Sequence, residues 1–397
     1  MIPVVGNALR PAATLADVYG DAKVFVPRAS FTDYGWLPSD PAVLDFLTGG
    51  QLTVAGDMPV VCHASVATDW IVDVLLGAGF DVAPNRLVYR DRDDCATLLR
   101  GLGRRAGSLV LQHAHPPNEI PDDAYWIDRA LLTFLNNKGN LERLVPEELC
   151  PRRRLVPLDR LCTEPRGFPV VVKAPSEMSS GAGFAVAICH TPEELAAAAT
   201  RFAACRNVVV EDFIDIERNL CVQYVVSHDG LVSYLGAAEQ VVDDDGNYLG
   251  NWLERAAAPP SVVAAGSGVV QAAADLGYRG IAGLDIVVAR DGAVLVIDLN
   301  FRLNGSTVPL LFADALAGAH GDDHVARFRG WRVAAGRSVR GVVETATATG
   351  DVVPLSMFDP AMSPYEGALG RVAGMVVGAS RAEVEDAERR LRELGLE

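Results

Sequence analysis

The stretch Gly283–Thr307, GLDIVVARDGAVLVIDLNFRLNGST, decides the fold that we expect for this chain. Two runs rich in β-branched residues, Ile286–Ala289 and Ala293–Ile297, are separated by Arg290-Asp291-Gly292, a sequence typical of a tight turn. The pattern predicts a β-hairpin. Antiparallel pairing brings the start of its first strand and the end of its second to the same edge.

Acidic and amide side chains gather at that edge. Asp285 is expected to open the first strand and Asp298 to end the second. Asn300 follows Asp298 by two residues, so both side chains of an extended chain point to one face. Such oxygen ligands suit Mg²⁺, and Arg302 on the same face suits a transferring phosphoryl group or a developing oxyanion. The alternative is an acidic hairpin whose charges are only solvated.

Length and composition limit the classes of protein to consider. The 397 residues indicate two or three domains, and 50% hydrophobic with 22% charged residues indicates a globular chain. The net charge of −16 argues against nucleic acid and anionic membranes as partners. We find no apolar run long enough to span a bilayer and no signal-peptide pattern at the start of the sequence.

The cysteine pattern indicates a reducing compartment. The seven cysteines form no C-x-x-C pair and no small-domain disulfide framework. We therefore expect reduced, mostly buried thiols and a cytoplasmic protein.

The first third of the chain, to about residue 135, reads as an open α/β unit. Short apolar runs are typical of buried strands, and a helical pattern lies between them. The runs are Val4-Val5, Lys23–Val26, Pro59–Cys62 and Ser108–Gln112, and the helix is Asp69–Leu76. The absence of a G-x-G-x-x-G sequence argues against a dinucleotide cofactor.

Two histidines, His113 and His115, follow the last of these runs, where open sheets place groups that contact ligands. A metal site is disfavoured because no third ligand lies nearby in the sequence. We expect a packing role in the loop or a contact to a polar substrate.

A candidate phosphate-binding segment lies near the middle of the chain. Phe168–Lys173 is a predicted strand that ends in a lysine, and a second strand follows the intervening loop. Ser179, Ser180, Gly181 and Gly183 give that loop hydroxyl and backbone donors for an anion. A helix with Thr191 as its N-cap and Glu194 at N3 is expected next. The alternative is an ordinary glycine-rich turn.

Asn207–Asp215 is a further predicted strand, in which Glu211 lies beside Phe213 and Ile214. This combination suits a purine, because the ring gains an apolar slot and a carboxylate can accept from an exocyclic amine. The alternative is a solvated acid on a hinge.

In order, the sequence shows Lys138 after a helical pattern, a strand lysine with a Ser/Gly loop, a strand glutamate and the acidic hairpin with its D-x-N-x-R run. This series resembles the ATP-grasp superfamily of ligases between about Lys138 and Thr307. The order of domains and the run DLNFRLNGST are similar, more narrowly, to the pheganomycin-type peptide ligases.

The resemblance implies a function for each motif. Lys138 and Lys173 would contact ATP phosphates under a lid formed by Ser179–Gly183, and Lys173 and Arg302 would be catalytic. Glu211, Phe213 and Ile214 would hold adenine, Glu217 the ribose, and Asp285, Asp298 and Asn300 the Mg²⁺, with Mn²⁺ as an alternative ion. Glu239-Gln240 stands where several members have a lysine, so charge compensation is expected mainly from Lys173 and Arg302.

The expected fold class is α/β and α+β, an ATP-grasp fold preceded by a Rossmann-like pre-ATP-grasp domain. The expected domains are residues 1–135, 136–330 with a lid subdomain at about 155–210, and a small α+β domain at 331–397. In the last, we expect strands at Gly341–Thr345 and Arg371–Val377 and a helix that begins after Ser380 and ends at Gly395.

The expected activity is an ATP-dependent carboxylate–amine ligase that forms an amide through an acyl phosphate and releases ADP. Its partners would be small carboxylates and amines, namely amino acids or short peptides, and a homodimer is the default assembly. A kinase or carboxylase of the same fold, and an ATP-binding regulatory module, stay open as alternatives.

Overall fold

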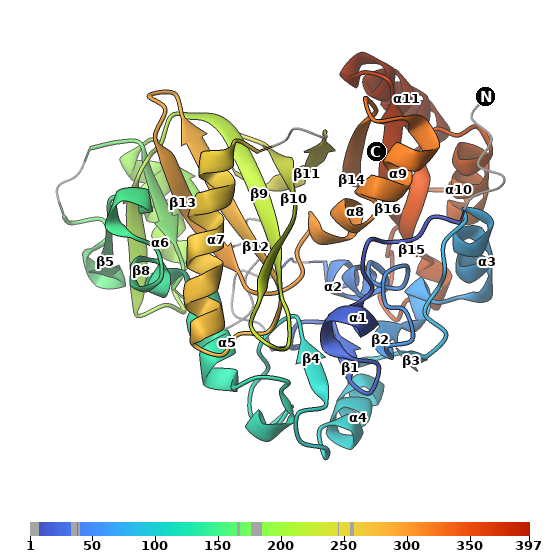
Figure 1. Ribbon diagram of the computed structural model, residues 1–397, viewed down its shortest axis with the longest axis horizontal. Coiled ribbons are helices and arrows are strands. Elements are labelled where there is room, and N and C mark those ends of the chain that lie inside the picture. The colour runs from blue at the N-terminus through green and yellow to red at the C-terminus, as the bar shows by residue number, and fades with distance from the viewer. Residues whose placement is uncertain are drawn as a thin grey trace.

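The computed structural model describes residues 8–32, 38, 40–164, 167–175, 185–244, 246–254 and 258–397. Three sheets organise these residues. In Figure 1, a small sheet lies at the left, a large sheet runs through the middle, and the parallel sheet of the N-terminal segment lies below it. The helices of the C-terminal segment cover the right-hand part.

The N-terminal segment forms a four-stranded parallel sheet with the order β3-β2-β1-β4. Its strands are β1 Val24–Val26, β2 Val60–His63, β3 Arg86–Tyr89 and β4 Leu109–Leu111, and its helices are α1 Leu15–Tyr19, α2 Ala42–Phe46, α3 Asp69–Gly77, α4 Arg92–Leu102 and α5 Arg129–Asn136. Three predicted strands and the predicted helix over α3 are confirmed, whereas Val4-Val5 lies outside the described residues.

The small sheet is antiparallel and has the order β5-β8-β6-β7. Its elements are β5 Arg153–Pro157, β6 Val170–Lys173, β7 Val186–Cys189, α6 Pro192–Arg201 and β8 Asn207–Asp212. The predicted N-cap of α6 is confirmed, because the Thr191 hydroxyl accepts from the backbone N–H of Glu194 at 3.2 Å. Valines and leucines of the sheet and α6 form a separate core.

The large sheet has eight strands in the order β13-β12-β9-β10-β11-β14-β16-β15, and its neighbouring strands are antiparallel. The strands are β9 Ile216–Val226, β10 Val232–Val242, β11 Tyr248–Leu253, β12 Gly280–Ala289, β13 Val294–Asn300, β14 Val325–Arg332, β15 Val353–Phe358 and β16 Arg371–Gly378. The helices are α7 Pro260–Asp275, α8 Thr307–Leu311, α9 Ala313–His320, α10 Val339–Ala348 and α11 Arg381–Leu394.

The predicted hairpin is confirmed as β12 and β13, and Asp285 lies directly opposite Asp298 in its register. One detail of the prediction is wrong, because Asp285 does not open its strand. β12 begins five residues earlier, at Gly280, since Ile281, Ala282 and Leu284 are buried and pair with β9. The carboxylates are therefore set within the sheet and not at a frayed end.

The C-terminal segment differs from the prediction at one element. Gly341–Thr345 was expected to be a strand but belongs to helix α10. The buried residues of α10 recur with helical spacing, and the Ser338 hydroxyl caps the helix by accepting from Gly341 N–H at 3.2 Å. The strand over β16 and the cap of α11 at Ser380 are confirmed, and Gly395 ends α11 with φ 101°.

Strands β14, β15 and β16 continue the large sheet without a break. The division into residues 1–135, 136–330 and 331–397 stays a prediction. Within the described ranges, no helix is both long and apolar enough to cross a bilayer. All seven cysteines are free thiols, and four of them are buried.

Two glycines of α7 test how closely this helix packs on the large sheet. A Cβ at Gly266 would lie 2.5 Å from the hydroxyl of buried Tyr224 on β9, whereas a Cβ at Gly268 would meet nothing within 4 Å. We expect Gly266→Ala to lower the free energy of unfolding by about 1–3 kcal/mol through overpacking. Gly268→Ala should raise it by about 0.5–1 kcal/mol. Urea denaturation measures both, and equal stability of the two variants would contradict the packing described here.

Candidate functional site

The paired aspartates of the β12–β13 hairpin are held among cations and amides. Lys138, at the start of the 3-10 helix Lys138–Arg143, forms an ion pair with Asp298 Oδ2. Burial raises the pKa of Asp298, but Lys138, Lys173 and Arg302 outweigh it and hold that pKa below its usual range. Asp298 therefore stays a carboxylate.

For Asp285, the effects that raise the pKa outweigh those that lower it. Burial and the neighbouring charge of Asp298 raise the pKa of Asp285, and the side-chain amide of Gln240 donates to its Oδ1 at 2.5 Å. The two carboxylates repel each other across the strand pair, and a bound cation would relieve that repulsion. Across the part of the chain that the structure describes, no group of three or more His, Cys, Asp or Glu side chains forms a metal-binding cluster.

Asn300 is the last residue of β13, and Arg302 lies two residues beyond the end of that strand. Both side chains are buried, and Asn300 pairs with Gly283 across the hairpin. Arg302 donates to Asn136 Oδ1 at 2.8 Å, and the same oxygen accepts from the backbone N–H of Phe301 at 3.1 Å. Burial lowers the pKa of Arg302, while the charges of Asp298 and Asp285 raise it.

Lys173 joins the small sheet to the large one. Its Nζ donates to the carbonyl of Ile297 at 2.7 Å and lies 2.6 Å from Oε2 of Glu211. Lys173 and Glu211 are both about 95% buried, and Arg153 is a further charged neighbour at 3.4 Å from Oε1 of Glu211. Arg153 Nη1 and Glu211 Oε1 form this ion pair with each other, but neither atom makes a hydrogen bond among the residues that the structure describes. Their remaining hydrogen-bonding capacity fits a polar ligand.

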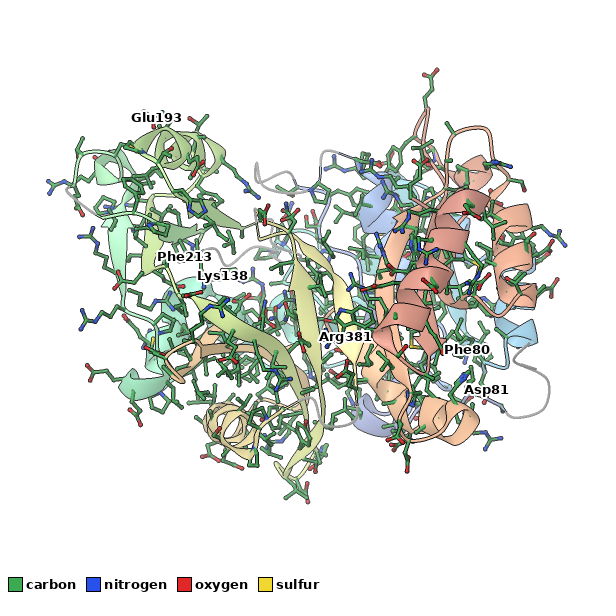
Figure 2. The ribbon with its side chains drawn as sticks, turned by 90° about the horizontal axis from the view of Figure 1, so that it is seen from above. Phe80, Asp81, Lys138, Glu193, Phe213 and Arg381 are labelled. Carbon is green, nitrogen blue, oxygen red and sulfur yellow. The ribbon has the colours of Figure 1, made fainter. Side chains whose placement is uncertain are left out.

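The predicted adenine-binding residues follow β8. Phe213 is 41% exposed and lies 5.9 Å from the ring of His190. Ile214 is partly buried, and Glu217 is exposed near the start of β9, where the register of β9 with β12 shifts. Figure 2 shows the labelled Lys138 and Phe213 in the same half of the molecule, with Phe80 and Asp81 in the other half.

The predicted lid residues Ser179, Ser180, Gly181 and Gly183 lie outside the described residues. The two strands that flank them, β6 and β7, form an antiparallel pair in which Lys173 lies opposite Val186.

Glu239 and Gln240, neighbours in β10, contact different parts of the protein. Gln240 contacts Asp285, whereas Glu239 lies 3.7 Å from Arg218 and 3.3 Å from Arg381 of α11. Neighbouring residues of a strand point to opposite faces, so only Gln240 reaches the acidic pair. Of the two residues that stand where several members of the superfamily have a lysine, the one that contacts the acidic pair is a neutral amide.

Sequence reasoning missed a set of buried polar residues next to Arg302. The amide of Gln223 donates to Asn304 Oδ1 at 2.7 Å and to the sulfur of Cys221 at 3.2 Å. The hydroxyl of Thr307 donates to Gln223 Oε1 at 3.0 Å. This network holds the turn that follows Arg302 against β9. Its signal in the sequence was the run NGST, whose partners come from a distant strand.

His115 has a structural role. Its ring nitrogens lie 2.9 Å from Glu119 Oε2 and 2.9 Å from the carbonyl of Arg28, and the side chain is buried. His320 and His324 lie on either side of Gly321, which ends α9 with φ 91°, so they do not form a regular helical pair.

Two models of one protein family match the sequence. Residues 14–133 match the N-terminal domain of L-aspartate–L-methionine ligase, and residues 151–300 match its ATP-grasp domain. Both matches are therefore to one family of ligases within the ATP-grasp superfamily.

Solved structures with the same fold cover nearly the whole chain. An N5-carboxyaminoimidazole ribonucleotide synthetase in complex with ADP superposes with a TM-score of 0.58 at 12% identity, over 96% of this chain and 98% of that one. The L-amino acid ligase from Bacillus licheniformis has a TM-score of 0.55 at 14% identity, over 94% and 97%. The ADP complex of the Staphylococcus aureus N5-carboxyaminoimidazole synthetase has a TM-score of 0.56 at 10% identity, over 97% and 100%.

The predicted fold, with an ATP-grasp core after a Rossmann-like N-terminal sheet, is therefore confirmed. Taken together, the matched family models and the shared fold show that the chain belongs to the ATP-grasp superfamily and is an ATP-dependent carboxylate–amine ligase.

Proposed function

We propose that this ligase joins two amino acids, and that L-aspartate as the acid and L-methionine as the amine are the first pair to test. The support for this pair is the family whose models match residues 14–133 and 151–300. The observation that supports the chemistry is the cross-strand pair Asp285–Asp298, surrounded by Lys138, Lys173 and Arg302.

The donor set at the hairpin fits a divalent cation. Asp285, Asp298 and Asn300 offer carboxylate and amide oxygens, the ligands that Mg²⁺ prefers, and they leave room for phosphate oxygens. These three residues would hold Mg²⁺, or Mn²⁺ in its place. A bound Mg²⁺ supplies positive charge that neutralises the phosphate oxygens during transfer.

The remaining groups divide the nucleotide between them. Lys138 and Lys173 bind its phosphates, and their present partners Asp298 and Glu211 keep both ammonium groups in place beforehand. Glu211, whose Oε1 makes no hydrogen bond among the described residues, accepts from the adenine amine beside Phe213 and Ile214. Glu217 accepts from the ribose.

The reaction proceeds in two steps. The carboxylate of the first amino acid attacks the γ-phosphate of ATP and forms an acyl phosphate with release of ADP. The amine of the second then displaces phosphate and forms the amide. Arg302, which interacts with Asp298 and Asp285, would stabilise the charge that develops on the acyl oxygen, and positioning supplies most of the rate.

Replacement of one carboxylate tests the metal-binding assignment. We expect Asp298→Asn to lower ADP formation at least about 100-fold, because the pair loses the charge that binds the cation. The matched control is Asp291→Asn in the exposed turn of the same hairpin, which should keep wild-type turnover. Coupled-enzyme measurement of ADP compares them, and a D298N variant as active as D291N would refute the assignment.

Substitutions in the buried pair Lys173–Glu211 distinguish an effect on stability from an effect on nucleotide binding. Lys173→Met leaves the Glu211 carboxylate without its ammonium partner and should lower the free energy of unfolding by about 3–5 kcal/mol. Adding Glu211→Gln should restore part of that stability but not the affinity for ATP. Thermal melts with and without ATP measure both effects. An ATP affinity equal to wild type in Lys173→Met would remove Lys173 from the nucleotide site.

Product analysis tests the substrates. With ATP and Mg²⁺, ADP should accumulate when L-aspartate and L-methionine are both present, and mass spectrometry should detect their condensation product. The other proteinogenic amino acids, each offered as acid and as amine, serve as comparison. ADP formed with the acid alone and without any condensed product would instead indicate a kinase.

A further inference from the structure

The small sheet carries a group of buried charged side chains on one of its two faces. Lys173, Glu211 and Arg153 come from β6, β8 and β5, and Arg153 lies directly opposite Glu211 in the register of β5 with β8. The valines of the other face pack with α6 in a separate core. Figure 1 shows the small sheet beside β13 of the large sheet, where Lys173 donates to the carbonyl of Ile297. The charged group therefore lies between the two sheets.

Arg153 is the member of this group that has no function in the proposed nucleotide site. Its side chain is only 4% exposed. One guanidinium nitrogen, Nη2, donates to the backbone carbonyl of Lys138, and the other, Nη1, lies 3.4 Å from Oε1 of Glu211. A buried guanidinium is costly unless acceptors compensate its charge, so these two contacts hold the side chain in place. Arg153 thereby links two residues that contact opposite ends of the nucleotide in the proposed function.

The first contact of Arg153 fixes the backbone of Lys138. This residue begins a short 3-10 helix, and its ammonium group pairs with Asp298 on the large sheet. The helix lies close to the small sheet, because a Cβ at Gly139 would lie 2.9 Å from the Cβ of Pro175, just after β6. Arg153 therefore holds the peptide from which the proposed phosphate-binding lysine extends.

The second contact of Arg153 fixes the carboxylate of Glu211. Lys173 lies 2.6 Å from Oε2 of this carboxylate, and Arg153 places a positive charge beside Oε1. A carboxylate with a cation at each oxygen has little freedom to rotate. Oε1 makes no hydrogen bond among the described residues, so it keeps its capacity to accept from an amine. This arrangement favours adenine over a purine with a carbonyl in place of the amine, because that oxygen would face the carboxylate.

We propose that Arg153 is a positioning residue for the nucleotide, an inference that rests on the ligase function proposed above. It holds the carboxylate that accepts from the adenine amine and the peptide of the lysine that binds the phosphates at a fixed separation. The preference for ATP over inosine triphosphate (ITP), which has an oxygen in place of the amine, therefore depends on Arg153, although Arg153 does not touch the base.

The preference between the two nucleotides distinguishes this role from a contribution to stability alone. Isothermal titration calorimetry with Mg²⁺ and either ATP or ITP, without amino acids, measures each affinity, and thermal melts report folding. We expect Arg153→Met to weaken ATP binding about 10- to 100-fold, since the variant loses a charged contact at each end of the nucleotide site. ITP lacks the amine, so its binding should weaken less, and the preference for ATP over ITP should fall.

The matched control is Arg154→Met, at the neighbouring position of β5. The side chain of Arg154 is 49% exposed and pairs with Glu164 at 3.2 Å, so this variant should keep both affinities. Arg153→Lys retains a positive charge beside Glu211 but has a single nitrogen, which cannot serve both partners. It should fold like wild type and bind ATP with an affinity between those of wild type and Arg153→Met. If Arg153→Met does not fold, Arg153→Lys alone decides.

The outcomes separate this inference from the function on which it rests. Wild-type affinity for ATP in the Arg153 variants, or an equal loss for ATP and ITP, would overturn the role of Arg153. A loss in Arg154→Met as large as that in Arg153→Met would do the same. A wild-type protein that binds ATP and ITP equally would remove Glu211 from the base site and this inference with it. A wild-type protein that binds neither nucleotide would overturn the proposed function itself.

Discussion

Two carboxylates, those of Asp285 and Asp298, lie opposite each other on neighbouring antiparallel strands. Most of the surrounding side chains offset the repulsion between them. Like charges directly across a strand pair destabilise a sheet. Here Lys138 pairs with Asp298, Gln240 donates to Asp285, and Lys173 and Arg302 add positive charge. The partners come from four separate segments of the chain. The two acids therefore interact with the small sheet, with the 3-10 helix Lys138–Arg143 and with the large sheet at one place.

The positive charge around these two acids contrasts with the negative net charge of the whole chain. The chain has a net charge of −16, yet Lys138, Lys173 and Arg302 gather at the proposed nucleotide site. The two lysines contact acids of the protein itself, Asp298 and Glu211. Exchange of these internal partners for phosphate oxygens replaces one set of ion pairs with another, so the desolvation of the lysines has largely occurred before nucleotide binds.

The parts of the fold that were predictable from the sequence are those governed by local chemistry. Runs rich in β-branched residues on either side of Arg290-Asp291-Gly292 predicted the hairpin, and Thr191 with Glu194 predicted the start of α6. Helix α10 was missed because the short apolar run within it fits either a strand or a helix, and only its burial in the core settles the period.

The sequence predicts residues for the site but not the contacts that these residues make. The spacing of Asp298 and Asn300 places them on one face of β13, whereas Arg302 lies two residues beyond the end of that strand. The contacts of Gln240 with Asp285, of Asn136 with Arg302 and of Lys173 with the carbonyl of Ile297 link distant segments. No periodicity or turn rule relates such segments, since their approach depends on how whole sheets pack.

The unbroken course of the large sheet limits how this enzyme can be shortened. Strand β14 covers the edge of β11, and β16 and β15 extend the sheet beyond it. A chain cut before residue 325 would leave the N–H and C=O groups of β11 unpaired along an open strand, which is a template for association with other chains. Removal of the C-terminal residues would therefore favour aggregation over a smaller working ligase, so expression designs should retain them.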